Sequence, residues 1–585
     1  MSIRIGIRPI IDGRGKVRDQ LEEKTMNMAR AAQKLIQSRV RGRDGLPAEC
    51  LIGSTTISCR AEAVRVDAEF ASKNVVATLS VTPIFSYGTE TLDFSPHTVK
   101  AVWGFNGTER PGAVYLACAM SGYADYGIPA FSIYGKDVQE LDDDEIPPDV
   151  AEKILAFARC AVAVGEMRDR SYLSIGGVAM GISGSYMDPI VLHDYFGMRA
   201  EWVDMSEVQR RIQKGIYDKD EYVRAAEWVK ENIREGREYY NDENTRHGLA
   251  QKKEDWEICI KMALIFKDLM QGNSALADMG YREESFGRNA IAAGFQGQRQ
   301  WTDFMPNADF AESILNTSFD WNGTRAPFIF ATENDTLNGM SMLLQHLLTN
   351  QASVFADVRT YWSPEAIARI GGKLSGRAKN GFIHLNNSGA AALDGAGEMK
   401  RKGVSAMKPW WEVSEEDIAQ TLKATEWPPA NLEYFRGGGF SSHFVTRAEM
   451  PVTLTRINRV KGLGVTIQIA EGYTVKLDRE LSDKIEKRTD PAWPSTFFAP
   501  LLTGRGAFAS VYDVMANWGA NHGCFTYGHI GADLITLASM LRIPVSMHNV
   551  SEDRIFRPHA WGAFGTEDKQ GADYRACRQF GPLYR

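Results

Sequence analysis

Short apolar runs alternate with amphipathic segments along the first third of the chain. The segment 21–40, between the first two runs, has apolar residues at the three- and four-residue spacing of a helix that faces a core, and 150–167 shows the same pattern. The predicted strands are residues 3–7, 50–52, 75–81, 101–103, 130–134 and 172–175. Strand–helix alternation at this spacing predicts a parallel, doubly wound α/β sheet.

The pattern changes twice further along the chain. A polar, proline-containing break near residue 147 and the strand at 172 place a domain boundary near residue 170. From 206 to 270 the chain is charged and strongly helical, and its charged positions are expected to face water. Segments 452–457 and 464–475 alternate apolar and polar residues, as half-buried antiparallel strands do, so the last third is expected to be β-rich.

Composition excludes several classes of protein. With 585 residues the chain is too long for a single core, and its net charge of −7 argues against a nucleic-acid partner. The chain contains no run of the roughly 20 apolar residues that a membrane span needs. Seven scattered cysteines without metal spacing, and the lack of a signal-peptide pattern, predict reduced thiols in the cytoplasm.

Two carboxylates stand out because each follows a short apolar run of β character. Residues 328–332 lead to Glu333, which is followed at once by helix-starting residues, and residues 354–356 lead to Asp357. Strand ends that precede helices are where α/β sheets bind ligands. Two carboxylates there can hold a hard cation or exchange protons with a substrate, although capping a helix is an alternative role for each.

Other polar residues give weaker signals. His522 and His529 lie seven residues apart in a glycine-rich stretch, a spacing that does not by itself define a metal site. Gln296, Gln298 and Trp301 suit a polyhydroxylated ligand, because amides bind hydroxyls and an indole face stacks on C–H groups. The glycines between 176 and 184 lack the GxGxxG spacing, so a tight strand–helix turn is predicted there and a nucleotide site is not.

Taken together, motifs spread over nearly the whole chain resemble those of the L-fucose isomerase family, whose members also act on D-arabinose. The motifs are GIRP (6–9), GFNGTERPG (104–112), FQGQ (295–298), ATEND (331–335), FADVRTYWSPE (355–365), YFRGGG (434–439) and MANWGANHG (515–523). The resemblance implies two doubly wound α/β domains, 1–170 and 171–352, followed by a β-rich, barrel-like domain, 353–585. It also implies a cytoplasmic, manganese-dependent homohexamer of carbohydrate metabolism with sites near its subunit interfaces.

Carried over by motif, the Mn²⁺ ligands implied by the resemblance are Glu333, Asp357 and His522, with the two carboxylates also serving as the acid–base pair. Moving a carbonyl from C1 to C2 of a sugar removes a weakly acidic proton and gives a cis-enediol whose oxygens a divalent ion stabilises. An O,O,N ligand set suits Mn²⁺ better than a thiolate site would. This chemistry needs no redox cofactor.

The sugar is expected to contact Gln296 and Gln298 through hydroxyls. The candidate stacking rings are Phe85, Trp301, Tyr434 and Trp493, and Phe85 is expected to reach a neighbouring subunit's pocket. The predicted reaction is the conversion of L-fucose to L-fuculose. Three alternatives remain: D-arabinose, converted to D-ribulose, as the main substrate; a non-catalytic sugar-binding protein; and, last, a dinucleotide-dependent sugar dehydrogenase.

Overall fold

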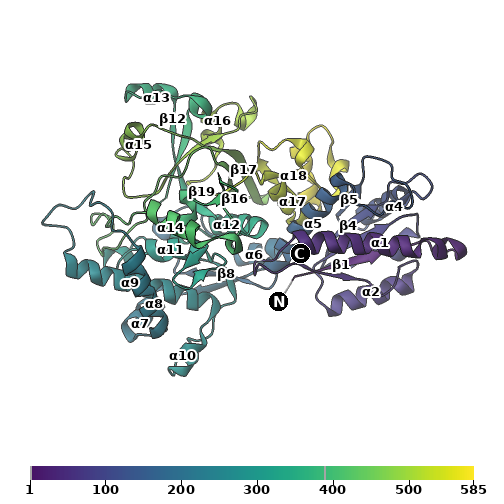
Figure 1. Ribbon diagram of the computed structural model, residues 1–585, viewed down its shortest axis with the longest axis horizontal. Coiled ribbons are helices and arrows are strands. Elements are labelled where there is room, and N and C mark those ends of the chain that lie inside the picture. The colour runs from purple at the N-terminus through teal and green to yellow at the C-terminus, as the bar shows by residue number, and fades with distance from the viewer. Residues whose placement is uncertain (1–2, 388–389) are drawn as a thin grey trace.

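The computed structural model of the protein describes residues 3–387 and 390–585. Its first sheet is parallel throughout, with the strand order β2-β1-β3-β4-β5. Its strands are β1 (Arg4–Pro9), β2 (Glu49–Ile52), β3 (Ala77–Thr82), β4 (Val99–Gly104) and β5 (Ala130–Tyr134). Its main helices are α1 (Gly15–Arg39), α2 (Arg60–Ser72), α4 (Gly112–Asp125) and α5 (Pro148–Met167). Helices α1 and α5 share one core with the sheet and α2 and α4 share another, so both faces are covered. The predicted doubly wound sheet is confirmed (Figure 1).

The second sheet is also parallel, with the strand order β11-β8-β6-β7. Its strands are β6 (Ser171–Ile175), β7 (Arg199–Val203), β8 (Ala290–Phe295) and β11 (Ile329–Ala331). The charged segment forms the helices α7 (Met205–Lys214), α8 (Lys219–Asn232) and α9 (Leu249–Gln271), as predicted. Phe295 and Phe330 pack with α9 on one face, whereas Ala292 and Ile329 pack with α12 (Thr336–Thr349) on the other. The strand order leaves β11 at one edge of the sheet.

Six antiparallel strands close into a barrel after the second sheet. They are β12 (Val354–Trp362), β13 (Phe382–Asn386), β16 (Pro451–Val460), β17 (Gly464–Thr474), β18 (Ser495–Pro500) and β19 (His522–Tyr527). Their order is β16-β19-β12-β13-β18-β17, and β16 pairs with β17 to complete the ring. The two strands predicted from alternation at 452–457 and 464–475 form that closing pair. A β-rich, barrel-like C-terminal domain is confirmed.

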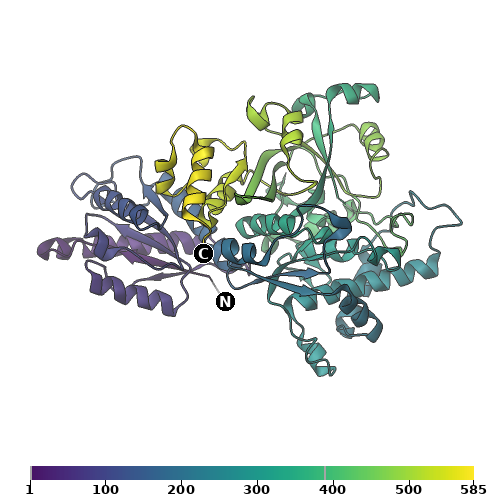
Figure 2. The ribbon, with the colours of Figure 1, turned by 180° about the vertical axis from the view of Figure 1, so that it is seen from behind.

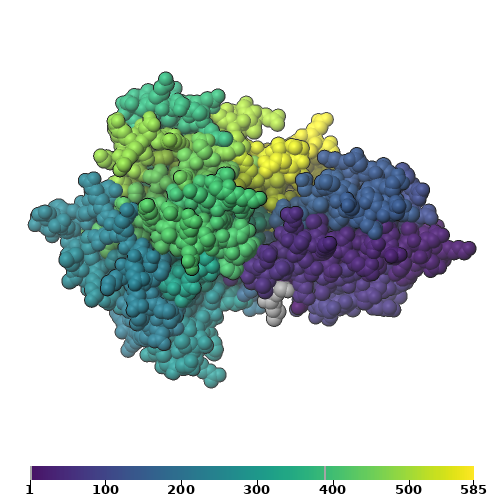
Figure 3. Space-filling view, in the orientation of Figure 1, coloured from purple at the N-terminus to yellow at the C-terminus, as the bar shows by residue number. Residues whose placement is uncertain are grey.

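The last segment of the chain returns to the first sheet, which the sequence pattern did not predict. Helix α17 (Gly531–Leu541) packs on α5, where Arg159 pairs with Asp533 at 3.0 Å between Nη2 and Oδ2. Helix α18 (Lys569–Phe580) follows. Seen from either side, this yellow segment lies between the barrel and the first sheet (Figures 1 and 2), and it fills the surface there (Figure 3). The domain limits 1–170, 171–352 and 353–585 remain a prediction. The first of these domains begins with residues 1 and 2, which lie outside the described residues.

The longest helices are α1, with 25 residues, and α9, with 23. Both carry charged residues along their length, as helices that face a core on one side and water on the other do. Within residues 3–387 and 390–585, no helix combines the length and the apolar composition that crossing a membrane requires.

Two buried histidines predict a loss of stability in acid. His346 on α12 and His384 on β13 are both 0% exposed, and burial lowers the pKa of His346 to about 4 and that of His384 to about 3 from the ordinary 6.5. Both stay neutral when folded while the unfolded chain takes up protons. Their contribution to stability is therefore complete above pH 6.5 and is lost as the pH falls from 6.5 toward 4 and 3, by up to about 1.4 kcal/mol per pH unit for each histidine.

Urea unfolding between pH 7.5 and pH 5 measures this loss. His346→Gln should make the stability less dependent on pH over this range. His193→Gln is the comparison variant, because the His193 side chain is 67% exposed. An unaltered pH dependence in His346→Gln would show that this imidazole takes up protons equally in the folded and unfolded chain, and would contradict the prediction.

Candidate functional site

Glu333 lies between an edge strand and a helix start, where the sequence predicted it. Strand β11 ends at Ala331, and the chain makes one 3₁₀ turn, Thr332–Asn334, before α12 begins. In this turn Glu333 has a φ of +58° and Asn334 a φ of +50°. Successive left-handed residues other than glycine cost roughly 1 kcal/mol or more each, and such strain is typical of functional sites. The turn points the carboxylate away from the regular path of strand and helix.

Asp357 does not lie at the end of its strand, and this prediction was wrong. Strand β12 continues to Trp362, and Ser363 caps α13 (Pro364–Arg369) only after that. The strand runs on because it is a barrel strand, hydrogen-bonded to β13 and β19 on its two sides. In this register Asp357 lies directly opposite His522 on β19. Directly opposed residues on antiparallel strands have Cβ atoms roughly 5 Å apart, so the barrel makes these two side chains neighbours.

The three predicted metal ligands come together in space. His522 Nε2 lies 3.3 Å from Glu333 Oε2 and 3.5 Å from Asp357 Oδ1. The side chains of His522 and Glu333 are 3% and 10% exposed, and that of Asp357 is 28% exposed. The site is therefore nearly enclosed, and Asp357 is its most accessible member.

Asp335 holds the imidazole from behind, a role that the sequence analysis missed. His522 Nδ1–H donates to Asp335 Oδ2 at 2.6 Å, and Arg456 Nη1 donates to the same oxygen at 2.6 Å. Asp335 and Arg456 are 0% and 1% exposed. A carboxylate that accepts from one ring nitrogen fixes the tautomer and aims the other nitrogen, an arrangement common around metal-binding histidines. Asp335 lies two residues after the predicted ligand Glu333, and this position could have indicated a role in the site. It was interpreted only as part of a helix start.

Burial and neighbouring charges shift the proton affinities of the site. Burial raises the pKa of Asp357 to about 6; Glu333 adds to this rise, and His522 and Arg359 oppose it. Burial lowers the pKa of His522, but its hydrogen bonds to Asp335 and Glu333 outweigh burial and bring the pKa to about 10. Burial also acts to raise the pKa of Asp335, yet Arg456 and His522 hold it below the ordinary value. Asp357 is thus a carboxyl group able to exchange protons near neutral pH.

Two of the predicted sugar-binding residues, Gln296 and Trp493, have partners close to the site. Gln296 follows β8, and its Oε1 accepts from Gly177 N–H at 2.6 Å, which ties the glycine-rich turn after β6 to this edge of the sheet. Trp493 is half-buried, and the Arg359 guanidinium lies over its ring at 5.5 Å from the centroid. Arg359 lies two residues beyond Asp357 on β12. The ring therefore lies beside the strand that carries Asp357.

Three further aromatic candidates have other surroundings. Tyr434 is 58% exposed and available to a ligand. Phe85 lies after β3 in the first domain, where it packs near Ile11 and Leu21 and meets Tyr87 edge-on at 6.4 Å. Trp301 is 2% exposed in the core beside α9, and its indole N–H donates to Pro306 O. The prediction that Trp301 stacks on a sugar was therefore wrong.

The three side chains fit a divalent cation in chemistry, and their two distances from His522 Nε2 are close to those between neighbouring ligand atoms. Neighbouring ligand atoms around a small ion lie about 3 Å apart when the ion–ligand bonds are about 2.1 Å long. The distances of 3.3 and 3.5 Å from His522 Nε2 come close to this. In the described part of the chain, no group of three or more histidine, cysteine or acidic side chains is already arranged as a metal site. Here Glu333 and Asp357 are oriented as ion-pair partners of the imidazole, so their oxygens do not yet share a common centre.

Comparison with known proteins gives matches along most of the chain. Residues 2–169 match the family model "L-fucose isomerase, first N-terminal domain", residues 170–350 match the second N-terminal domain and residues 385–548 match the C-terminal domain. An L-fucose isomerase of Streptococcus pneumoniae serotype 4 is 58% identical over 584 residues, which are 100% of this chain and 99% of that protein. An L-fucose isomerase of Bacteroides fragilis is 57% identical over 587 residues, with the same coverage.

Proposed function

The chain belongs to the L-fucose isomerase family, and from this premise we propose that it converts L-fucose to L-fuculose through a cis-enediol. The observation that carries the proposal is the meeting of Glu333, Asp357 and His522, which come from the second sheet and from two neighbouring barrel strands. Two carboxylates can serve as the acid–base pair for proton transfer between adjacent sugar carbons, and the imidazole can serve as a third metal ligand.

The two carboxylates divide the proton transfers between them. One takes the proton from C2 and returns it to C1, and the other moves the proton between the O1 and O2 hydroxyl positions. Asp357 suits either task because it is the most accessible of the three side chains, with 28% of its surface exposed. A divalent cation held by Glu333, Asp357 and His522, which we propose to be Mn²⁺, would act as a Lewis acid for the charge that develops on the sugar oxygens.

Residues around the ligands orient and enclose the sugar. Trp493, held against Arg359, presents a ring beside Asp357, and the exposed Tyr434 offers a second ring with a hydroxyl. Gln296 retains an amide N–H₂ for a sugar hydroxyl while its carbonyl oxygen binds Gly177. Phe85 belongs to the first domain, which supports a role for it in a neighbouring subunit's site within a homohexamer. We assign the protein to the cytoplasm on the same family grounds.

A sugar panel with purified protein tests the reaction. L-Fucose should give ketose in a metal-stimulated reaction, with Mn²⁺ the most effective of the divalent ions tried. D-Arabinose should react as well, because discrimination against a ligand that lacks one methyl group is worth only about 1–3 kcal/mol. The ratio of kcat/KM for the two sugars then decides the preferred substrate. Saturable binding of L-fucose without ketose formation at any metal concentration would instead mark a sugar-binding protein.

Asp335→Asn is expected to weaken metal binding by about 10–100-fold, as losses behind a liganding histidine do. Asparagine keeps the shape of the side chain and can still accept from His522, but it removes the negative charge that aims the ring. Titration of the metal-free protein with Mn²⁺ measures the effect apart from turnover. Asp573→Asn is the matched control, because Asp573 is likewise buried and bonded to an arginine, Arg557, in another part of the chain. Equal metal affinity in both variants would leave Asp335 a purely structural residue.

A further inference from the structure

A cavity of about 910 Å³ lies between four segments that are distant in sequence, and Leu337 of α12 completes its lining. The segments are the end of the glycine-rich turn with α6 (Pro189–Phe196), the end of β16 with the β16–β17 turn, the chain just after α17, and α18 with the chain after it. Pockets for small molecules have volumes of about 300–1,000 Å³. Glu333, Asp357 and His522 are not among its lining residues, so it is a separate site.

The lining of this cavity is strongly basic, although the chain as a whole carries a net charge of −7. Its cations are Arg459, Lys461, Arg542, Arg578 and Arg585. Asp194 has the one acidic side chain among the lining residues, and its Oδ1 already lies 3.1 Å from the His193 ring. No ion pair joins any of the five cations to a carboxylate among the residues that the structure describes. Charge of one sign that is not neutralised within the fold attracts an anion to a concave surface.

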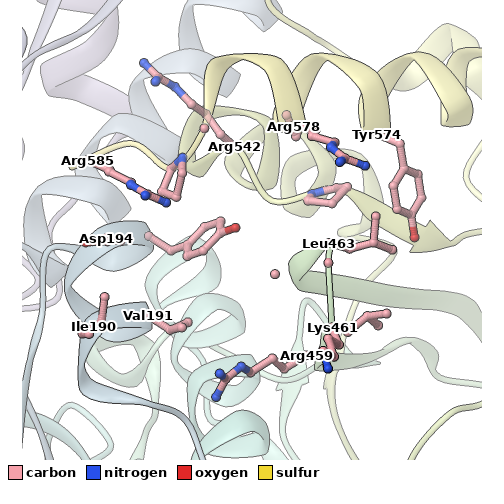
Figure 4. A pocket seen from close by; sticks show the side chains of 18 of the residues that line it. Ile190, Val191, Asp194, Arg459, Lys461, Leu463, Arg542, Tyr574, Arg578 and Arg585 are labelled. Carbon is pink, nitrogen blue, oxygen red and sulfur yellow. The ribbon is translucent and has the colours of Figure 1, made fainter.

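The cations surround the cavity from different elements. In Figure 4, Arg459 and Lys461 lie along its lower side, Arg585 lies on the side of α6, and Arg578 lies above, whereas the Arg542 side chain extends upward and away from the cavity. Several guanidinium groups around one space favour an anion with more than one negative charge, such as a phosphate, since each can give charge-assisted hydrogen bonds.

Apolar side chains complete the walls. Tyr195 of α6 is one of the lining residues. In Figure 4, Ile190 and Val191 line the side of α6, and Leu463 and Tyr574 line the opposite side. These rings and methyl groups suit the carbon body of a small molecule, whereas inorganic phosphate alone would leave them without contacts. We propose that this cavity binds a phosphorylated small molecule with a ring or carbon chain attached to its phosphate.

The end of β16 and the turn that follows it supply the most readily altered cations. Arg459 and Lys461 are both exposed, and Gly462 and Gly464 give the turn its left-handed positions, with φ of +88° and +83°. The double variant Arg459→Gln/Lys461→Gln therefore removes charge from the cavity without disturbing the core. Lys476→Gln/Arg479→Gln is its matched control, because both residues are exposed and lie outside the cavity.

Titration calorimetry on the full-length protein with glucose 6-phosphate, inorganic phosphate and glucose tests the proposal. We expect saturable binding of glucose 6-phosphate, weaker binding of inorganic phosphate and no binding of glucose. The Arg459→Gln/Lys461→Gln pair should weaken the binding of glucose 6-phosphate by about tenfold or more, the equivalent of one or more lost charge-assisted hydrogen bonds. The control pair should leave it unchanged.

Three results would overturn the proposal. They are the absence of saturable glucose 6-phosphate binding, an equal loss in the control pair, and loss of binding in His522→Ala, which would place the phosphate at the metal ligands. The readout does not involve turnover. An inactive protein that binds glucose 6-phosphate would thus contradict only the proposed isomerase reaction, and an active one that does not bind it would contradict only this site.

Discussion

Glu333→Gln and Asp357→Asn are each expected to lower kcat for L-fucose isomerisation by at least about 10²–10⁴-fold, the contribution of a positioned acid or base. Each replacement keeps the size and shape of the side chain and removes its ability to exchange a proton. The loss should exceed that of an ordinary acid–base residue, because each variant also removes a negative charge from the proposed cation site. Initial rates of ketose formation, with the metal content measured on the same samples, check both effects.

The matched control for these variants is Glu365→Gln. Glu365 is exposed in the first turn of α13, shortly after the end of β12, and has no contact with the three ligands. It should retain the activity of the unaltered protein. Thermal unfolding should show that Glu333→Gln and Asp357→Asn remain folded. Near-normal turnover in either of them would remove that residue from the acid–base pair and would leave the reaction without the mechanism proposed above.

His522→Ala is expected to weaken Mn²⁺ binding by more than about 100-fold, since losing a ligand should cost more than losing the group behind it. His529→Ala should have little effect, although His529 belongs to the same glycine-rich stretch. Its Nε2 bonds to Gly472 O at 2.9 Å and its ring packs edge-on against Tyr473, both remote from the carboxylates. Titration of the metal-free variants with Mn²⁺ compares the two histidines directly. A larger loss in His529→Ala would mean that the wrong imidazole has been assigned.

A comparison of His522→Ala with Asp357→Asn separates the loss of metal binding from the loss of a proton-transfer group. Asp335 and Arg456 remain paired in His522→Ala, so the region behind the ring should stay folded. High Mn²⁺ concentrations should therefore restore part of the activity of His522→Ala, whose acid–base pair is intact. They should restore none in Asp357→Asn, which has lost one of its proton-transfer groups.

The sequence by itself determined much of the local structure. Spacing of apolar residues predicted the strands of the first sheet, helices α1 and α5, the charged helices α7 to α9 and the antiparallel pair β16–β17. The family motifs predicted that Glu333, Asp357 and His522 belong to one site. The helices and strands could be predicted because the spacing of apolar residues indicates which side of an element is buried, and this spacing lies within a single segment.

Only the tertiary structure decided how distant segments meet. The register of β12 against β19 places Asp357 opposite His522, and the edge position of β11 brings Glu333 to them from another sheet. Asp335 can bond to the His522 ring only because the start of α12 packs against the barrel. The basic cavity likewise collects residues from four separate segments. Pairing between strands and packing between domains depend on contacts far apart in the sequence, and no local pattern encodes their partners.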